Sequence, residues 1–354
     1  MIRTLSTGVC APALAALTLL SLSACDGGQG GTRSGVWAAG SSTVFPFTTR
    51  VAENFARAND SAMPRVESLG TGGGIQAFCA GIGPATPDIA NASRRMKGSE
   101  FDMCQANGVT DILEIKIGYD GLVIAIARNG TDYAFEGADL YLAVAKQVPG
   151  PNGFIANPNT DWSQVRAGLP AGRILMYGPP PTSGTRDSWV ELGLTPSAEA
   201  VPQLAALAES DADRFEAIAH TVREDGVWVD SGENDNAIVQ TLTRTPGAMG
   251  VFGYSFLEQN NDQVKAASVN GIYPTLETIS SGDYPIARSM FIYVKLAHIG
   301  VTPGLEQFIT EYLSDASAGR GGYLQDRGLV PLLPDELEAQ RASARARTPM
   351  QRPE

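Results

Sequence analysis

Four short segments rich in glycine and hydroxyl side chains punctuate this 354-residue chain. Most of them follow a short apolar stretch that is typical of a buried strand and precede residues with helical periodicity. Strands that alternate with helices in this way predict the α/β class, with a mainly parallel sheet. The four segments lie at residues 40–43, 70–74, 88–94 and 183–187.

The fourth segment, Ser183-Gly184-Thr185-Arg186-Asp187, indicates what such openings can bind. Backbone N–H groups at a helix start are free, and the helix dipole makes that end electropositive. Glycine lets the backbone approach a ligand, hydroxyls add donors, and arginine offers a planar fork to an oxyanion. Several such openings together predict a cage for a small tetrahedral anion such as phosphate. The alternative is a plain helix cap with a surface arginine.

The apolar and helical patterns predict the following elements. We expect strands at 36–39, 66–69, 114–118, 122–127, 173–178, 248–254 and 285–294. We expect helices at 46–58, 133–148, 187–192 (ended by Gly193), 197–222, 235–243 and 304–313. Residues 335–354 lack a hydrophobic pattern, and we predict a disordered tail there.

The first 35 residues have the pattern of an exported lipoprotein. Arg3 precedes an apolar run from Val9 to Leu22 that is short for a membrane span, and Leu22-Ser23-Ala24-Cys25 resembles a lipobox. We predict a signal peptide over 1–24, lipidation of Cys25 and a flexible tether over 25–35. This would place the protein in the periplasm or at the cell surface, anchored to the membrane. A plain cleaved signal peptide is the alternative.

Cysteine and histidine usage narrows the chemistry further. Cys79 and Cys104 remain as an even pair in an oxidising compartment, which predicts a disulfide, with two separate buried thiols as the alternative. The chain has two histidines, His220 and His298, and lacks a CxxC motif, so we expect neither a metal site nor a histidine-based triad.

Net charge argues against one class of ligand. The formal charge is −12, whereas binding to a phosphate backbone needs a basic surface. We therefore expect no nucleic-acid partner. A few local donors inside a closed cleft can still dominate the binding of a small anion.

The chain from Trp37 to Leu333 resembles the phosphate-binding proteins of phosphate-specific ABC transporters. This resemblance implies two α/β lobes, as in a type II-like periplasmic binding protein, joined by two crossing hinge strands. It implies crossings near 118–126 and 248–256, and hence lobe one at 36–119 plus 257–334 and lobe two at 120–256. The matching motifs lie at 40–47, 72–74, 88–94, 117–121, 183–187 and 253–257.

The resemblance also implies a set of phosphate-binding residues. Hydroxyls or N–H groups come from each of the four loops, and arginine supplies positive charge. The expected ligand residues are Ser42, Thr43, Thr71, Gly72, Ser93, Arg94, Ser183, Gly184, Thr185 and Arg186.

Two positions depart from the family's pattern. Better-known relatives have an aspartate, which accepts the proton of hydrogen phosphate, where this chain has Arg94. They also have an arginine where this chain has Pro179, so we expect Arg186 to supply that charge. Asp187 or Asp120 would then have to act as the acceptor, and surface pairing of Arg94 with an acid is the alternative to ligand contact.

These expectations predict capture without catalysis or cofactor. A monomeric protein would close on phosphate and deliver it to the permease of an ABC importer. The alternatives are a protein for another oxyanion such as arsenate or sulfate, a phosphate sensor, and a phosphohydrolase that uses Ser183 or Thr185 as nucleophile.

Overall fold

The computed structural model describes residues 35–231 and 235–354. The expected signal peptide, Cys25 and nearly all of the tether lie outside the described residues. Nine described strands form one mixed sheet in the order β2-β1-β3-β13-β4-β10-β8-β9, with β11 also paired to β4. No helix in this described part is both long enough and apolar enough to cross a bilayer.

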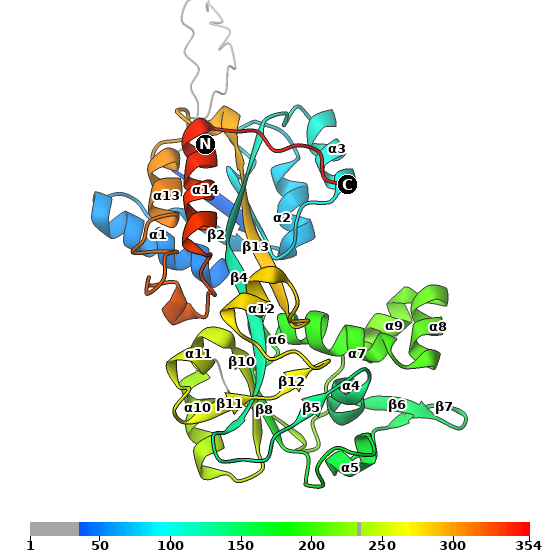
Figure 1. The fold of residues 1–354 in the computed structure, drawn as a ribbon. Coiled ribbons are helices and arrows are strands. Elements are labelled where there is room, and N and C mark those ends of the chain that lie inside the picture. The colour runs from blue at the N-terminus through cyan, green and yellow to red at the C-terminus, as the bar shows by residue number, and fades with distance from the viewer. Residues whose placement is uncertain (1–34, 232–234) are drawn as a thin grey trace, which may run out of the picture. The chain divides into compact units, whose positions relative to one another are not determined.

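Lobe one is built on the first half of this sheet. β1 pairs in parallel with β2 and β3, and β13 pairs antiparallel with β3 and β4. The helices α1, α2, α3, α13 and α14 belong to this lobe (Figure 1). The bounds are β1 Trp37–Gly40, α1 Phe45–Asn59, β2 Arg65–Ser68, α2 Gly70–Phe78, β3 Ile89–Ala92, α3 Gly98–Ala106, β13 Ala287–Lys295, α13 Leu305–Tyr312 and α14 Pro334–Ala346.

Helix α1 shows why the sequence folds locally as predicted. Phe47, Val51 and Phe55 recur on one face and are buried, and Pro46 stands in the first turn, where its missing N–H costs nothing. Phe55 meets Phe308 of α13 edge to face, with ring centroids 5.6 Å apart. This packing holds α1 against α13, and the loop at 40–43 leads into the start of α1.

Lobe two is built on the second half of β4. β10 pairs antiparallel with β4, and β8 joins β10 to β9 through parallel pairs. The strand bounds are β5 Ala134–Phe135, β6 Gln147–Gly150, β7 Gly153–Ala156, β8 Met176–Gly178, β9 Trp228–Asp230, β10 Met249–Gly253, β11 Val264–Ala266 and β12 Ser268–Val269. The helix bounds are α4 Asp139–Val144, α5 Trp162–Val165, α6 Gly184–Ser188, α7 Thr195–Glu199, α8 Pro202–Ser210, α9 Ala212–Ala219, α10 Asp235–Arg244, α11 Tyr254–Gln259 and α12 Leu276–Ser281.

Strand β4, Ile112–Ala127, is the first connection between the lobes. Its residues 112–121 pair with β13, and its residues 122–127 pair with β10 and β11. Figure 1 shows β4 running through both lobes with β13 beside it. The two apolar stretches expected at 114–118 and 122–127 are thus one continuous strand.

The second crossing lies elsewhere than expected. We expected it near 248–256, but β10 is paired along its whole length with the lobe-two part of β4, and α11 begins directly after it. β11 then pairs with residues 125–127 of β4, so the chain stays in lobe two until β13. The prediction of lobe one at 257–334 is therefore wrong for 257–281. An apolar run marks a buried strand but not its partner.

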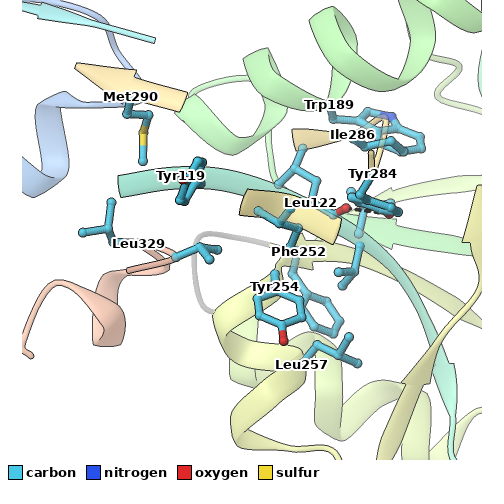
Figure 2. Close-up of a cluster of buried hydrophobic side chains, with 14 of the residues drawn as sticks. Tyr119, Leu122, Trp189, Phe252, Tyr254, Leu257, Tyr284, Ile286, Met290 and Leu329 are labelled. Carbon is cyan, nitrogen blue, oxygen red and sulfur yellow. Dashed lines mark hydrogen bonds between the residues drawn. The ribbon is translucent and has the colours of Figure 1, made fainter. Parts of the chain in front are cut away.

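A cluster of buried apolar side chains surrounds the crossing (Figure 2). Leu122 of β4, Phe252 of β10 and Tyr284 lie together, and the Tyr284 hydroxyl donates to the Leu122 carbonyl oxygen at 2.9 Å. Burial raises the pKa of Tyr284 far above its usual value, so this hydroxyl stays a donor. The cluster fixes where β4 leaves lobe one.

The C-terminal segment is not a disordered tail, as we had expected. Residues 334–346 form α14, which packs on β4 with Leu337 buried. The Tyr119 hydroxyl donates to both oxygens of the Glu336 carboxylate at 2.7 and 2.8 Å, and Lys116 Nζ lies 3.2 Å from the same group. A single buried leucine gives little periodicity, so the sequence carried almost no helical signal.

Two further helix predictions are wrong. The stretch 133–148 holds only the short α4 between β5 and β6. Gly193 does not end a helix, because residues 189–194 form a π-helical segment that continues into α7. A Cβ at Gly193 would lie 2.9 Å from the ring of Trp189, so close packing accounts for this glycine.

The predicted disulfide is confirmed. Cys79 and Cys104 are bonded across 25 residues and join the end of α2 to α3. Replacing both with serine should lower the free energy of unfolding by about 3 kcal/mol, because the unfolded chain regains loop entropy. Urea unfolding measures this loss. Wild type with reductant is the control, and equal stability of the oxidised wild type and the variant would contradict the prediction.

Glu336 should make stability depend on pH. Although partial burial opposes it, hydrogen bonds from Tyr119 and the Leu333 N–H, with Lys116, hold the pKa of Glu336 below its usual 4.5. A depressed folded-state pKa stabilises the protein above the unfolded value, and that contribution is lost as the pH falls. We expect Glu336→Gln to destabilise the protein at pH 6 and to cost much less at pH 3.5. A pH-independent cost in urea unfolding would contradict this.

Candidate functional site

The first loop of the site begins where β1 ends. At Gly40 (φ +144°) a Cβ would lie 2.2 Å from the Asn91 carbonyl oxygen, so this close approach of β1 to β3 requires glycine. The loop turns through Ser41, whose hydroxyl accepts the Val44 N–H at 3.3 Å, and α1 follows. Ser42 and Thr43 lie within this turn, between the end of β1 and the start of α1.

The second and third loops meet beside the first. The Thr71 hydroxyl lies 3.0 Å from the Ser93 hydroxyl and accepts the Ser93 N–H at 3.1 Å. Gly74 of α2 lies against Gly40, where a Cβ would lie 2.2 Å from Gly40 Cα. This close contact holds the start of α2 against the loop at 40–43. The three lobe-one loops thus lie side by side.

These loops line a cavity of about 240 Å³, which we call the hydroxyl cavity. Its lining residues are hydroxyl residues, glycines, two arginines and one glutamate. The lining residues are Ser41, Ser42, Thr43, Gly70, Thr71, Gly72, Ser93, Arg94, Glu191 and Arg288.

The fourth loop touches the first loop from lobe two. The Ser183 hydroxyl caps α6 by accepting the Thr185 N–H at 3.2 Å. At Gly184 a Cβ would lie 2.9 Å from the Ser42 carbonyl oxygen, and the Ser42 hydroxyl donates to Asp187 Oδ2 at 2.8 Å. The two lobes are therefore in direct contact at the site.

Ser183, Gly184 and Thr185 line a second cavity of about 330 Å³, which we call the acidic cavity. Thr43 lines both cavities. The acidic cavity is also lined by three aspartates and one arginine, and this excess of acidic residues disfavours an anion; the four are Asp120, Asp235, Asp326 and Arg327. Of the two spaces, the hydroxyl cavity is the one suited to an oxyanion.

Arg288 of β13 is a functional residue that sequence reasoning missed. Its Nη2 donates to the Ser188 hydroxyl at 2.8 Å and to the Thr43 hydroxyl at 3.2 Å, and its Nη1 donates to Glu191. The side chain is only 12% exposed, and its buried Nε has no hydrogen-bond partner. The available signal was a charge inside the otherwise apolar strand 285–294.

Asp120 of β4 faces Arg288 across the paired strands. The two residues are register partners, and Arg288 Nε lies 3.5 Å from Asp120 Oδ2. The same oxygen accepts the Ser188 hydroxyl at 2.6 Å. Asp120 is thus committed to structural partners and lines the acidic cavity, not the hydroxyl cavity, which weakens the expectation that it accepts a ligand proton.

A comparison with sequence profiles of protein families agrees with this two-lobed geometry. The sequence profile of the PBP superfamily domain matches residues 27–316. The chain belongs to the PBP superfamily. The predicted α/β fold class is confirmed.

Curated relatives and solved structures agree with this. The chain is 30% identical to the protein SphX of Synechococcus elongatus over 306 residues, which cover 85% of this chain and 78% of SphX. It is 29% identical to the phosphate-binding protein PstS of Staphylococcus saprophyticus over 88% of this chain and 86% of PstS. A possible phosphate-binding protein from Planctomyces limnophilus superposes with a TM-score of 0.69 at 27% identity, over 88% of this chain and 98% of that one.

The two predicted ligand arginines both have protein partners. Arg94 donates two hydrogen bonds to the Glu100 carboxylate, at 2.7 and 2.9 Å, while it lines the hydroxyl cavity. These bonds raise the pKa of Arg94. The alternative of an ion pair with an acid therefore describes the structure.

Arg186 points away from the hydroxyl cavity. Its Nη1 donates to the Pro179 carbonyl oxygen at 2.9 Å and to Asp230 at 3.1 Å, and its guanidinium lies 4.7 Å from the Trp228 ring centroid. Burial lowers the pKa of Arg186, with Asp230 opposing, but an arginine stays charged at physiological pH. Arg186 is not among the described residues that line either cavity.

Metal ligation finds no support within residues 35–231 and 235–354, where no group of three His, Cys, Asp or Glu side chains is placed to hold an ion. The two histidines lie in other contacts: His220 with Thr195 at 3.0 Å and His298 with Asp88 at 2.8 Å. Ser183, the nucleophile of the phosphohydrolase alternative, accepts a hydrogen bond from the Thr185 N–H as a helix cap.

Contact between the lobes should depend on Gly184. The methyl group of Gly184→Ala would lie 2.9 Å from the Ser42 carbonyl oxygen, so we expect the lobes to separate and the radius of gyration in small-angle scattering to rise. Gly172→Ala is the control, because its Cβ would lie 3.6 Å from the nearest atom, the Tyr133 hydroxyl. An unchanged radius for Gly184→Ala would contradict this.

Proposed function

We propose that this protein is the solute-binding component of an ABC importer and captures inorganic phosphate in the hydroxyl cavity. The observation that carries the proposal is the convergence of Thr43, Thr71 and Ser93, from three separate loops, on one cavity that also receives Arg288. Phosphate is favoured among oxyanions because the relatives include a phosphate-binding protein PstS that matches along most of its length.

The cavity offers enough donors for useful affinity. A hydrogen bond to a charged group contributes about 1.5–3 kcal/mol net. Micromolar binding requires about 8 kcal/mol, so a handful of aligned donors suffices once the cost of lobe closure is included. The hydroxyls, the glycine N–H groups and one guanidinium of this cavity would supply these donors.

Arg288 supplies the positive charge in this proposal, in place of the arginine that we expected at Arg186. Arg288 lines the hydroxyl cavity, whereas Arg186 stacks on Trp228 outside it. Because Arg288 stands on a crossing strand, the same charge serves the site whether the lobes are apart or together.

Further parts of the function rest on the sequence. We propose export, lipidation at Cys25 and anchoring to the membrane in the periplasm or at the cell surface. The closed monomer would dock on the importer's permease, with the ATPase step in the partner, because this chain has no GxxxxGK[ST] loop.

The test is titration calorimetry with phosphate, with sulfate and arsenate as competitors. Wild type should bind phosphate, and Arg288→Gln should weaken binding tenfold or more, or about 1.4 kcal/mol per decade. Arg186→Gln is the matched control and should change the affinity less than threefold. A larger loss for Arg186→Gln than for Arg288→Gln would return the role to Arg186, and wild type without phosphate affinity would refute the proposal.

One assay separates this function from the enzymatic alternative. A phosphohydrolase would release phosphate from a generic phosphate ester, and Ser183→Ala would abolish the release. We expect no turnover by either protein.

A further inference from the structure

Glu191 occupies an unusual place for a carboxylate. It lies on the π-helical segment Trp189–Leu194 of lobe two, and it accepts a hydrogen bond from Arg288 Nη1. Among the described residues that line the hydroxyl cavity, Glu191 alone carries a carboxylate, and it alone comes from lobe two. Its side chain is 53% exposed, so it reaches the cavity from the solvent side.

A second carboxylate, on the helix α6 that leads directly into this segment, makes a similar contact. Asp187 accepts the Ser42 hydroxyl at 2.8 Å, and Ser42 also lines the hydroxyl cavity. Residues 187 and 191 are four apart, about one helical turn, so one face of this segment presents both acids. Lobe two thus sets anionic oxygens against donors that an oxyanion would use.

We propose that Glu191 is an internal anion that holds Arg288 while the cavity is empty and that phosphate must displace it. This inference rests on the proposed function and assigns a regulator of affinity to the same site. The measured affinity is then the difference between the contacts that phosphate makes with Arg288 and the contact that Glu191 gives up. The exchange needs only a rotation of an exposed side chain, because Arg288 is the hydrogen-bonded partner of Glu191 and its other described interaction, with Arg94, is a charge interaction without a hydrogen bond.

The exchange would follow from charge. Arg288 already faces Asp120, so in the empty protein its single positive charge is shared by two carboxylates. A dianion at short range interacts about twice as strongly with a guanidinium as a monoanion does. Hydrogen phosphate, as a dianion, can therefore replace Glu191. A monoanion would have to displace the same carboxylate with a weaker attraction to Arg288.

The test compares phosphate binding by calorimetry in wild type, Glu191→Gln and Glu191→Ala. Both variants should bind phosphate about three- to fivefold more tightly, which corresponds to about 0.65–1 kcal/mol, the upper part of the range for partly exposed ion pairs. Glu199→Gln, at an exposed position at the end of α7, is the control for general charge and should leave the affinity within twofold of wild type.

A double-mutant cycle makes the test specific to Arg288. In the Arg288→Gln background, Glu191→Gln should no longer tighten phosphate binding, because the contact to be displaced is gone. Unchanged or weaker binding in both single Glu191 variants would overturn the inference and leave the proposed function intact. Wild type without phosphate affinity would overturn both.

Discussion

The antiparallel pairing of β13 with β4 is the constraint on which the rest of the structure depends. Residues 287–295 run beside residues 112–121, and β4 then continues into lobe two as the partner of β10 and β11. One strand is therefore shared by both halves of the sheet. Its register sets Arg288 opposite Asp120, so a buried charge pair stands at the junction of the lobes. The direct contact between the two charges is 3.5 Å long, and the Ser188 hydroxyl bridges them by hydrogen bonds to both partners.

This junction divides the candidate site into a fixed part and a part that can move with lobe two. Thr71, Ser93 and Arg288 are held by lobe one and the crossing strands, through close glycine contacts and hydroxyl pairs. Asp187 and Glu191 arrive with the other lobe, on a helix that begins at Gly184. Hinge closure in such proteins brings two half-sites together around a ligand. Here the second half-site meets the first with the carboxylates of Asp187 and Glu191.

Local signals in the sequence were sufficient for much of lobe one. The apolar spacing in α1 and the glycines at Gly40 and Gly74 act through nearby residues, and the even cysteine pair left one pairing. The second crossing was predicted wrongly at β10, because strand pairing is non-local. The apolar run of β10 does not reveal that it pairs with β4 in lobe two. Arg288 was missed because its role depends on facing Thr43 and Ser188, which lie 245 and 100 residues away. Arg186 was expected to supply the ligand's positive charge, but it points elsewhere, because a motif fixes the residue type and not the direction of a long side chain.

The chain's last residues have a consequence for how the protein is handled. Beyond α14, the Met350 N–H donates to the Ile112 carbonyl oxygen, and Arg352 makes two 2.8 Å hydrogen bonds to Asp102 on α3. The same helix carries Glu100, which holds Arg94 at the hydroxyl cavity. A purification tag or reporter fused after Glu354 would therefore emerge beside a helix that orients a cavity residue. Immobilising the protein through that end would bring the support close to α3 and thus to the partner of Arg94.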